Sequence, residues 1–132
     1  MATITEDYVS SEMAKLLKEK GFDEPCYGSY SYRGGNVVVR ASKLSNTDLC
    51  YHPDISGISA PTIQMVMKWL REVHGLFISI GNDDLDYNWQ IFDIKNRTKD
   101  LDPTCLTDSH GGYRKYELAC TLAIKYCLEN II

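Results

Sequence analysis

The stretch SAPTIQMVMKWLREVHGLFISI, residues 59–80, decides the fold that the sequence predicts. Its apolar residues recur at the three- and four-residue spacing that places side chains on one face of an α-helix. These residues are Ile63, Val66, Met67, Leu70 and Val73. Ser59 is a suitable N-cap for this helix, and Gly75 fits the left-handed conformation that commonly follows a last turn. Residues 76–80 are too few for a second helix and rich in strand-forming types, so the stretch predicts a helix followed by a strand.

The composition is that of an ordinary globular protein, because 44% of the 132 residues are hydrophobic and 24% are charged. A chain of this length is expected to fold as one domain, residues 1–132, with a core that needs no metal or disulfide. The formal net charge of −4 argues against a nucleic-acid binder, which normally has a basic face. No apolar run is long enough to span a bilayer, and the acidic N-terminal residues lack a signal core. We therefore expect a cytoplasmic protein with no membrane partner.

The five cysteines do not indicate a disulfide framework. Their number is odd, no two form a CxxC pair, and no secretion signal precedes them. Cys120 and Cys127 share the apolar face of a predicted helix, where we expect them to be buried, reduced thiols. Neither paired cysteines nor a spaced histidine pair occurs, so the sequence predicts no metal site and no cofactor.

The first half of the chain predicts a helix and a β-hairpin. Residues 5–20 carry an apolar stripe with Thr5 as the expected cap, and Gly21 ends this helix. Residues 27–32 and 37–40 are rich in strand-forming types and are joined by a glycine turn. The pattern therefore indicates two antiparallel strands directly after the first helix.

Two features of this half admit more than one interpretation. Tyr30 and Tyr32 share one face of the predicted strand, where they either form a stacking platform or cover the edge of the core. Residues 41–58 are rich in Ser, Asn, Asp and Gly and predict a loop. Residues 52–54 of this loop are His-Pro-Asp, the tripeptide of J-domain co-chaperones, but the sequence around them does not predict the two long flanking helices of a J-domain. We therefore interpret the tripeptide as a proline turn.

The second half adds another hairpin and a long final helix. A polar turn follows the strand at 76–80, and residues 87–94 then alternate apolar and polar side chains as a half-buried strand does. The turn lacks the glycine and the bidentate glutamate of a calcium loop. Residues 97–112 predict irregular structure, and residues 113–130 keep helical apolar spacing throughout.

The predicted order is α-ββ-α-ββ-α. Two amphipathic hairpins and three one-sided helices predict an α+β fold, in which an antiparallel sheet of about four strands has the three helices packed on one face. The other face of this sheet is expected to carry Tyr87 and Trp89. Trp69 lies at the margin of the central helix's apolar face, where an aromatic side chain either widens the core or anchors a partner.

The chain contains three distinctive segments: KLLKEKGFDEPC (residues 15–26), APTIQMVMKWLREVH (60–74) and YELACTLAIKYCLENII (116–132). Together these segments resemble a family of small uncharacterised proteins from gut-bacterial genomes and from phage-type or mobile elements. The resemblance implies a cytoplasmic accessory protein of a phage or mobile element. It implies no activity and no catalytic residue.

Two functional hypotheses follow. The first is a non-enzymatic interaction protein that binds a protein partner or a second copy of itself. The candidate interaction surface consists of Tyr30, Tyr32, Trp69, Tyr87 and Trp89. The alternative is a small ligand-binding protein or enzyme that uses the loops around His52, Cys105 and His110, where a thiol and a histidine can meet.

Nucleic-acid binding is a third hypothesis, which the acidic net charge disfavours. It would use the tyrosines together with Lys15, Lys18, Lys20, Arg33 and Arg40. We prefer an interaction protein, because the sequence shows neither a paired nucleophile and base nor a glycine-rich loop with the spacing of a phosphate site.

Overall fold

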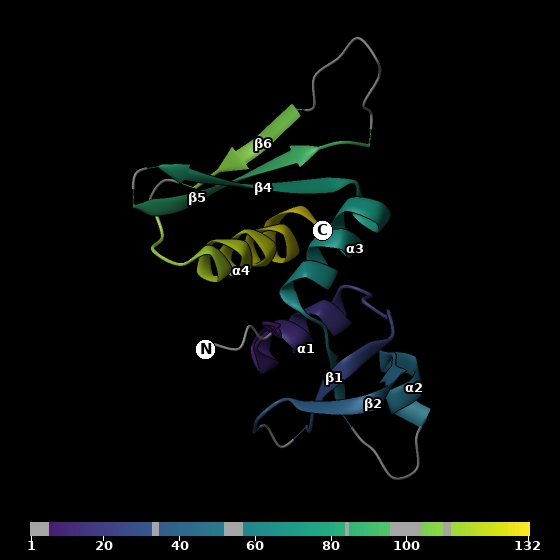
Figure 1. The fold of residues 1–132 in the computed structure, drawn as a ribbon. Coiled ribbons are helices and arrows are strands. Elements are labelled where there is room, and N and C mark those ends of the chain that lie inside the picture. Colours follow the sequence, from purple (N-terminus) through teal and green to yellow (C-terminus); the bar gives the residue numbers. More distant parts are fainter. Residues whose placement is uncertain (1–5, 33–34, 52–56, 84, 96–103, 110–111) are drawn as a thin grey trace. The chain divides into compact units, whose positions relative to one another are not determined.

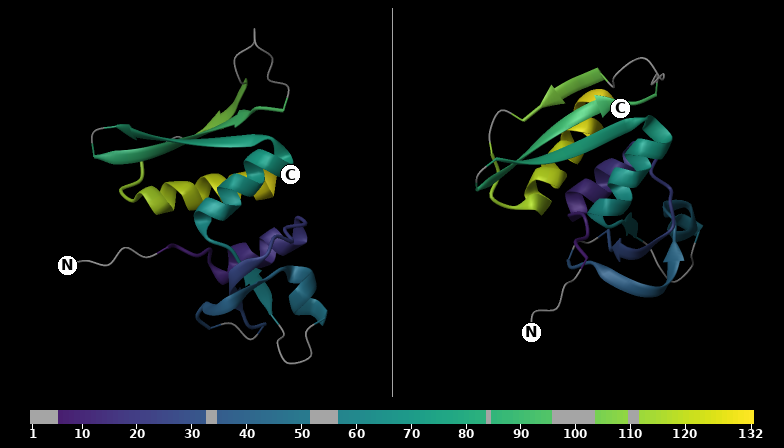
Figure 2. Two further views of the ribbon diagram at one scale, coloured as in Figure 1. Left: turned by 45° about the vertical axis from the view of Figure 1, so that its right-hand side comes forward. Right: turned by 45° about the horizontal axis from the view of Figure 1, so that its top comes forward.

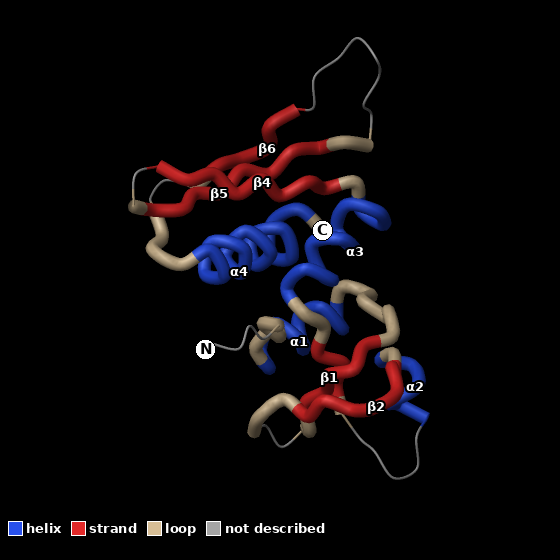
Figure 3. The backbone as a smooth tube through the Cα atoms, viewed as in Figure 1, coloured by secondary structure: helices blue, strands red, loops and turns tan. Residues whose placement is uncertain are grey.

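The computed structural model of the protein describes residues 6–32, 35–51, 57–83, 85–95, 104–109 and 112–132. In these residues the chain forms α-helices, strands and a terminal π-helix (Figure 1, Figure 3). Their order is α1 (Ser11–Glu19), β1 (Cys26–Tyr30), β2 (Val38–Leu44), α2 (Asn46–Tyr51), β3 (Ile58–Ala60), α3 (Ile63–His74), β4 (Leu76–Asp83), β5 (Asp86–Asp93), β6 (Thr104–Asp108), α4 (Tyr116–Tyr126) and η1 (Cys127–Ile131). The α+β class is confirmed, and the observed order is α-ββ-α-β-α-βββ-α.

The predicted single sheet is wrong. Both predicted hairpins are present, because β1 pairs antiparallel with β2 and β4 pairs antiparallel with β5. The hairpins nevertheless belong to separate three-stranded sheets, ordered β2-β1-β3 and β4-β5-β6. Each hairpin pairs with a third strand from a segment that the sequence predicts to be a loop or irregular, and these strands are β3 and β6.

The chain divides into two compact units, an N-terminal unit of residues 1–62 and a C-terminal unit of residues 63–132. Each unit contains one of the sheets and is described by itself. The expectation of a single domain over residues 1–132 stays a prediction.

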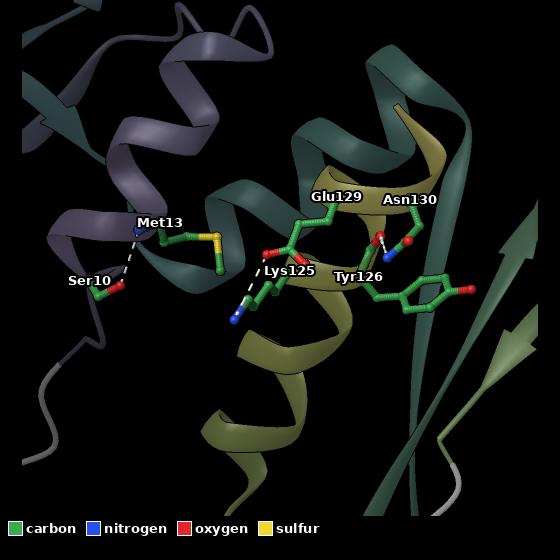
Figure 4. A network of polar contacts seen from close by, with 6 residues as sticks. All are labelled: Ser10, Met13, Lys125, Tyr126, Glu129 and Asn130. Carbon is green, nitrogen blue, oxygen red and sulfur yellow. Dashed lines mark hydrogen bonds and ion pairs between the residues drawn. The ribbon is translucent and has the colours of Figure 1, made fainter.

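In the N-terminal unit, the first helix begins later than predicted. Ser10 caps α1 by accepting a hydrogen bond from the amide of Met13 at 3.2 Å (Figure 4). Tyr8 instead forms an antiparallel bridge with Thr62, so it is not available to a helix. The end of the helix is as predicted: Gly21 has φ +91°, and the buried ring of Phe22 folds back as its amide donates to the Leu17 carbonyl at 2.9 Å.

The predicted loop at 41–58 is also corrected. β2 continues to Leu44, α2 follows directly, and β3 occupies three residues before the central helix. α2 begins where Ser45 and Asp48 cap each other: the Ser45 amide donates to Asp48 Oδ2 at 3.0 Å, and the Asp48 amide donates to Ser45 Oγ at 3.1 Å. Ser59 is a strand residue rather than the cap of α3. The His-Pro-Asp tripeptide lies outside the described residues.

In the C-terminal unit, α3 and α4 lie on the same side of the sheet (Figure 1, Figure 2). Directly opposite residues of an antiparallel pair share a face, and Ile78 faces Ile91 while Ile80 faces Trp89. Ile78, Trp89 and Ile91 are buried. This side of the β4–β5 hairpin therefore forms the core with the two helices.

The final helix confirms the predicted pattern and changes its ends. Tyr113 does not begin the helix, because it exchanges backbone hydrogen bonds with Tyr87 at 2.6 and 2.7 Å. The last residues wind as the π-helix η1. Two contacts join it to the end of α4: Lys125 forms an ion pair with Glu129 at 3.8 Å, and Asn130 donates to the Tyr126 carbonyl at 3.3 Å (Figure 4). The predicted buried thiols, Cys120 and Cys127, are confirmed as fully buried.

Candidate interaction surface

The five predicted aromatic residues are divided between the two units, with Trp69, Tyr87 and Trp89 in the C-terminal one. Trp69 and Trp89 are only 5% and 6% exposed. Tyr87 and Trp89 lie on the face of β5 that α4 covers, with ring centroids 5.7 Å from Tyr116 and 5.6 Å from Tyr126 respectively. The expectation that these two residues line the open face of a sheet is therefore wrong: they contribute to packing against a helix.

The two remaining tyrosines of the prediction lie in the N-terminal unit. Tyr30 is half-buried, and its hydroxyl donates to the Val9 carbonyl at 2.7 Å. Tyr32 is 51% exposed, and its hydroxyl accepts a hydrogen bond from the Lys18 ammonium at 2.8 Å. Of the five candidates, Tyr32 has the exposure that a binding surface requires, and Tyr30 fixes the position of the segment before α1.

The uncovered face of the C-terminal sheet carries the opposite set of β5 side chains. Phe77 of β4 lies opposite Phe92, and Phe92 lies opposite Cys105 of β6. The next row is polar, because Ser79 faces Gln90. This face is therefore a small aromatic pair bordered by polar residues, a composition that one open side of an antiparallel sheet normally tolerates.

Each sheet has an edge strand with no buried residue among its described side chains, β2 in the N-terminal unit and β6 in the C-terminal unit. Of the two, β2 is the longer. It lies at the edge of the order β2-β1-β3, and none of its seven residues is buried. Val38 and Val39 are exposed although their chemistry favours a core, and Arg40 and Lys43 follow them. No described strand pairs with the outer edge of β2, so its outward backbone groups have no sheet partner in the described part of the chain.

A bulge in β2 positions the two cations. Gly28 pairs with Val39 and Cys26 pairs with Leu44, so residues 40–43 lie opposite Tyr27 alone. Within this segment the Arg40 Nε donates to Ser29 Oγ at 3.4 Å. The Lys43 ammonium lies 5.2 Å from the centroid of the Tyr27 ring. Each cation thus contacts a residue of β1, and the strand predicted at 37–40 ended four residues before the observed end of β2 at Leu44.

A shallow hollow of about 420 Å³ lies elsewhere in the same unit, between the end of α1 and the helix α2. Its lining comprises Lys18, Gly21, Phe22, Asp23, Asn46, Thr47, Cys50 and Tyr51. Asp23 accepts hydrogen bonds from the side chain and the amide of Thr47, and these bonds hold the pKa of the carboxyl below its usual value. The principal anion in the hollow is therefore already engaged in holding α2.

The residues of the enzyme hypothesis do not form a described site. His52 and His110 lie outside the described residues, and Cys105 is an exposed residue of β6 whose thiol donates to the Thr107 carbonyl at 3.6 Å. Among the described residues there is no group of three or more His, Cys, Asp or Glu side chains that could hold a metal ion.

Three cysteines are buried, and burial makes their thiols poorly reactive. Burial raises the pKa of the Cys26 and Cys120 thiols and raises that of Cys127 to about 12. A thiol acts as a nucleophile through its thiolate, and a raised pKa leaves little thiolate at neutral pH. These cysteines are structural in character.

Comparison with known proteins adds no relative. No family model matches the chain, and no curated protein or solved structure gives a significant match. Within the described helices, none is both long and apolar enough to cross a membrane.

Proposed function

We propose that the chain is a small, non-enzymatic interaction protein, and that β2 is its binding element. The observation that carries the proposal is a seven-residue edge strand without a single buried side chain. An open edge offers N–H and C=O groups that an incoming strand can pair with, a recurrent mode of peptide recognition. The two exposed valines would gain from being covered.

The partner is another protein or a second copy of the chain, in keeping with the accessory role that the family resemblance implies. A second copy would pair β2 with β2 across a two-fold axis and produce a dimer. Sedimentation of the purified, reduced protein separates these outcomes, because a dimer that dissociates on dilution indicates self-pairing and a stable monomer indicates another protein.

The proposal is tested by selecting a random peptide library displayed on phage against the immobilised protein. We expect peptides that bind the wild-type chain and bind Val39→Ser about fivefold more weakly, because the substitution removes apolar contact at the edge. Val73→Ser is the matched control, since Val73 is 56% exposed, nearly the same as the 57% of Val39, and lies on α3. Recovery of no peptide, or equal losses in the two variants, would contradict the proposal.

The hollow beside α2 supports a second candidate, a ligand-binding protein whose site differs from the predicted loops around His52, Cys105 and His110. Its observation is the concave surface lined by Lys18, Asp23 and Cys50. A small-molecule fragment screen followed by NMR would support it if shifts concentrate at Thr47 and Cys50. Shifts spread along β2 instead would count for the edge strand.

A further inference from the structure

We draw no further inference here: the strongest candidate, the shallow hollow between the end of α1 and the helix α2, belongs to the second candidate function already described, and its described lining identifies no ligand, because the Asp23 carboxylate and the Lys18 ammonium are both engaged in hydrogen bonds within the chain.

Discussion

The strands β5 and β2 show how differently the two sheets use their members. β5 is the middle strand of its sheet, and its residues Trp89 and Ile91 are buried on the face that α4 covers. β2 is an edge strand of its sheet, and all of its side chains retain exposure. β5 pairs with a strand on each side and packs against a helix on one face, whereas β2 pairs with one described strand, β1.

The difference suggests separate roles: β5 stabilises the fold, whereas β2 is available for binding. A strand that is paired on both edges and covered on one face loses core contacts when it is changed. A strand with an open edge and exposed side chains can be changed at little cost to the fold, and its unpaired groups remain available for binding. The predictions that follow test whether the two strands behave in these two ways.

The largest expected effect is on the stability of the β5 side. Ile91→Ala removes a fully buried side chain opposite Ile78 and should lower the free energy of unfolding by about 3 kcal/mol, because a cavity remains. Val39→Ala, at an exposed position of β2, should cost less than about 0.5 kcal/mol. Urea unfolding followed by far-UV circular dichroism measures both, and equal losses would abolish the distinction between the strands.

The same experiment tests the single-domain prediction. Both tryptophans, Trp69 and Trp89, lie in the C-terminal unit, so tryptophan emission reports on that unit alone. Circular dichroism reports on both units. Coincident transitions are expected for one cooperative domain, and an emission transition that separates from the circular-dichroism transition would show that the units unfold independently.

Much of the fold could be predicted because periodicity is a local property. The spacing in α3 and α4 and the two hairpins depend on neighbouring residues, and all four were predicted in kind. β3 could not be found in this way, because three residues, Ile58–Ala60, are too few to show a period. Its pairing with β1 depends on contacts between distant segments, which also decide that the hairpins occupy different sheets.

The candidate surface was harder to predict for a related reason. Alternation indicates that Tyr87 and Trp89 share a face, but it does not say which face the helices cover. The aromatic rings pack against Tyr116 and Tyr126 of α4, which was visible only in the structure. The exposed edge had a sequence signal in the unbroken Val37–Val39 run and the absence of acidic residues around it, but exposure itself depends on which strand lies outermost.

A smaller effect is expected where the N-terminal unit holds its sheet to α2. Asn46 donates to the Phe22 carbonyl at 2.7 Å and accepts from the Ser59 amide at 2.8 Å, and both hydrogen bonds are buried. Asn46→Ala should cost about 2 kcal/mol, because two backbone groups lose their partner away from water.

Asn130→Ala is the matched control, because Asn130 is exposed and its hydrogen bond to Tyr126 stays within one helix (Figure 4). This change should cost less than about 0.5 kcal/mol. Thermal unfolding of the two variants decides the matter. If Asn46→Ala lowers the free energy of unfolding no more than Asn130→Ala does, the hydrogen bonds of Asn46 do not fix the position of α2. The hollow beside α2 would then not have a rigid lining on that side.

The smallest expected effect is a pH dependence of the C-terminal unit through His74. Burial, with a further contribution from the Lys95 charge, lowers the pKa of this histidine from its ordinary 6.5. Its Nε2 atom is buried and has no hydrogen-bond partner among the described residues, so a proton there would gain no acceptor.

The unfolded chain therefore binds the proton first as the pH falls through 6.5, and the folded state loses stability until the pH reaches the lower pKa of folded His74. Urea midpoints read from tryptophan emission should decline over this range, and His74→Gln should reduce the decline. Asp23 acts at lower pH, because the stability from its lowered pKa is lost as the pH falls through its ordinary 3.8 toward the lower folded value. If the decline is unchanged in His74→Gln, other titratable groups cause the pH dependence. The T-shaped contact between the Trp69 and His74 rings, whose centroids lie 4.6 Å apart, would then contribute packing alone.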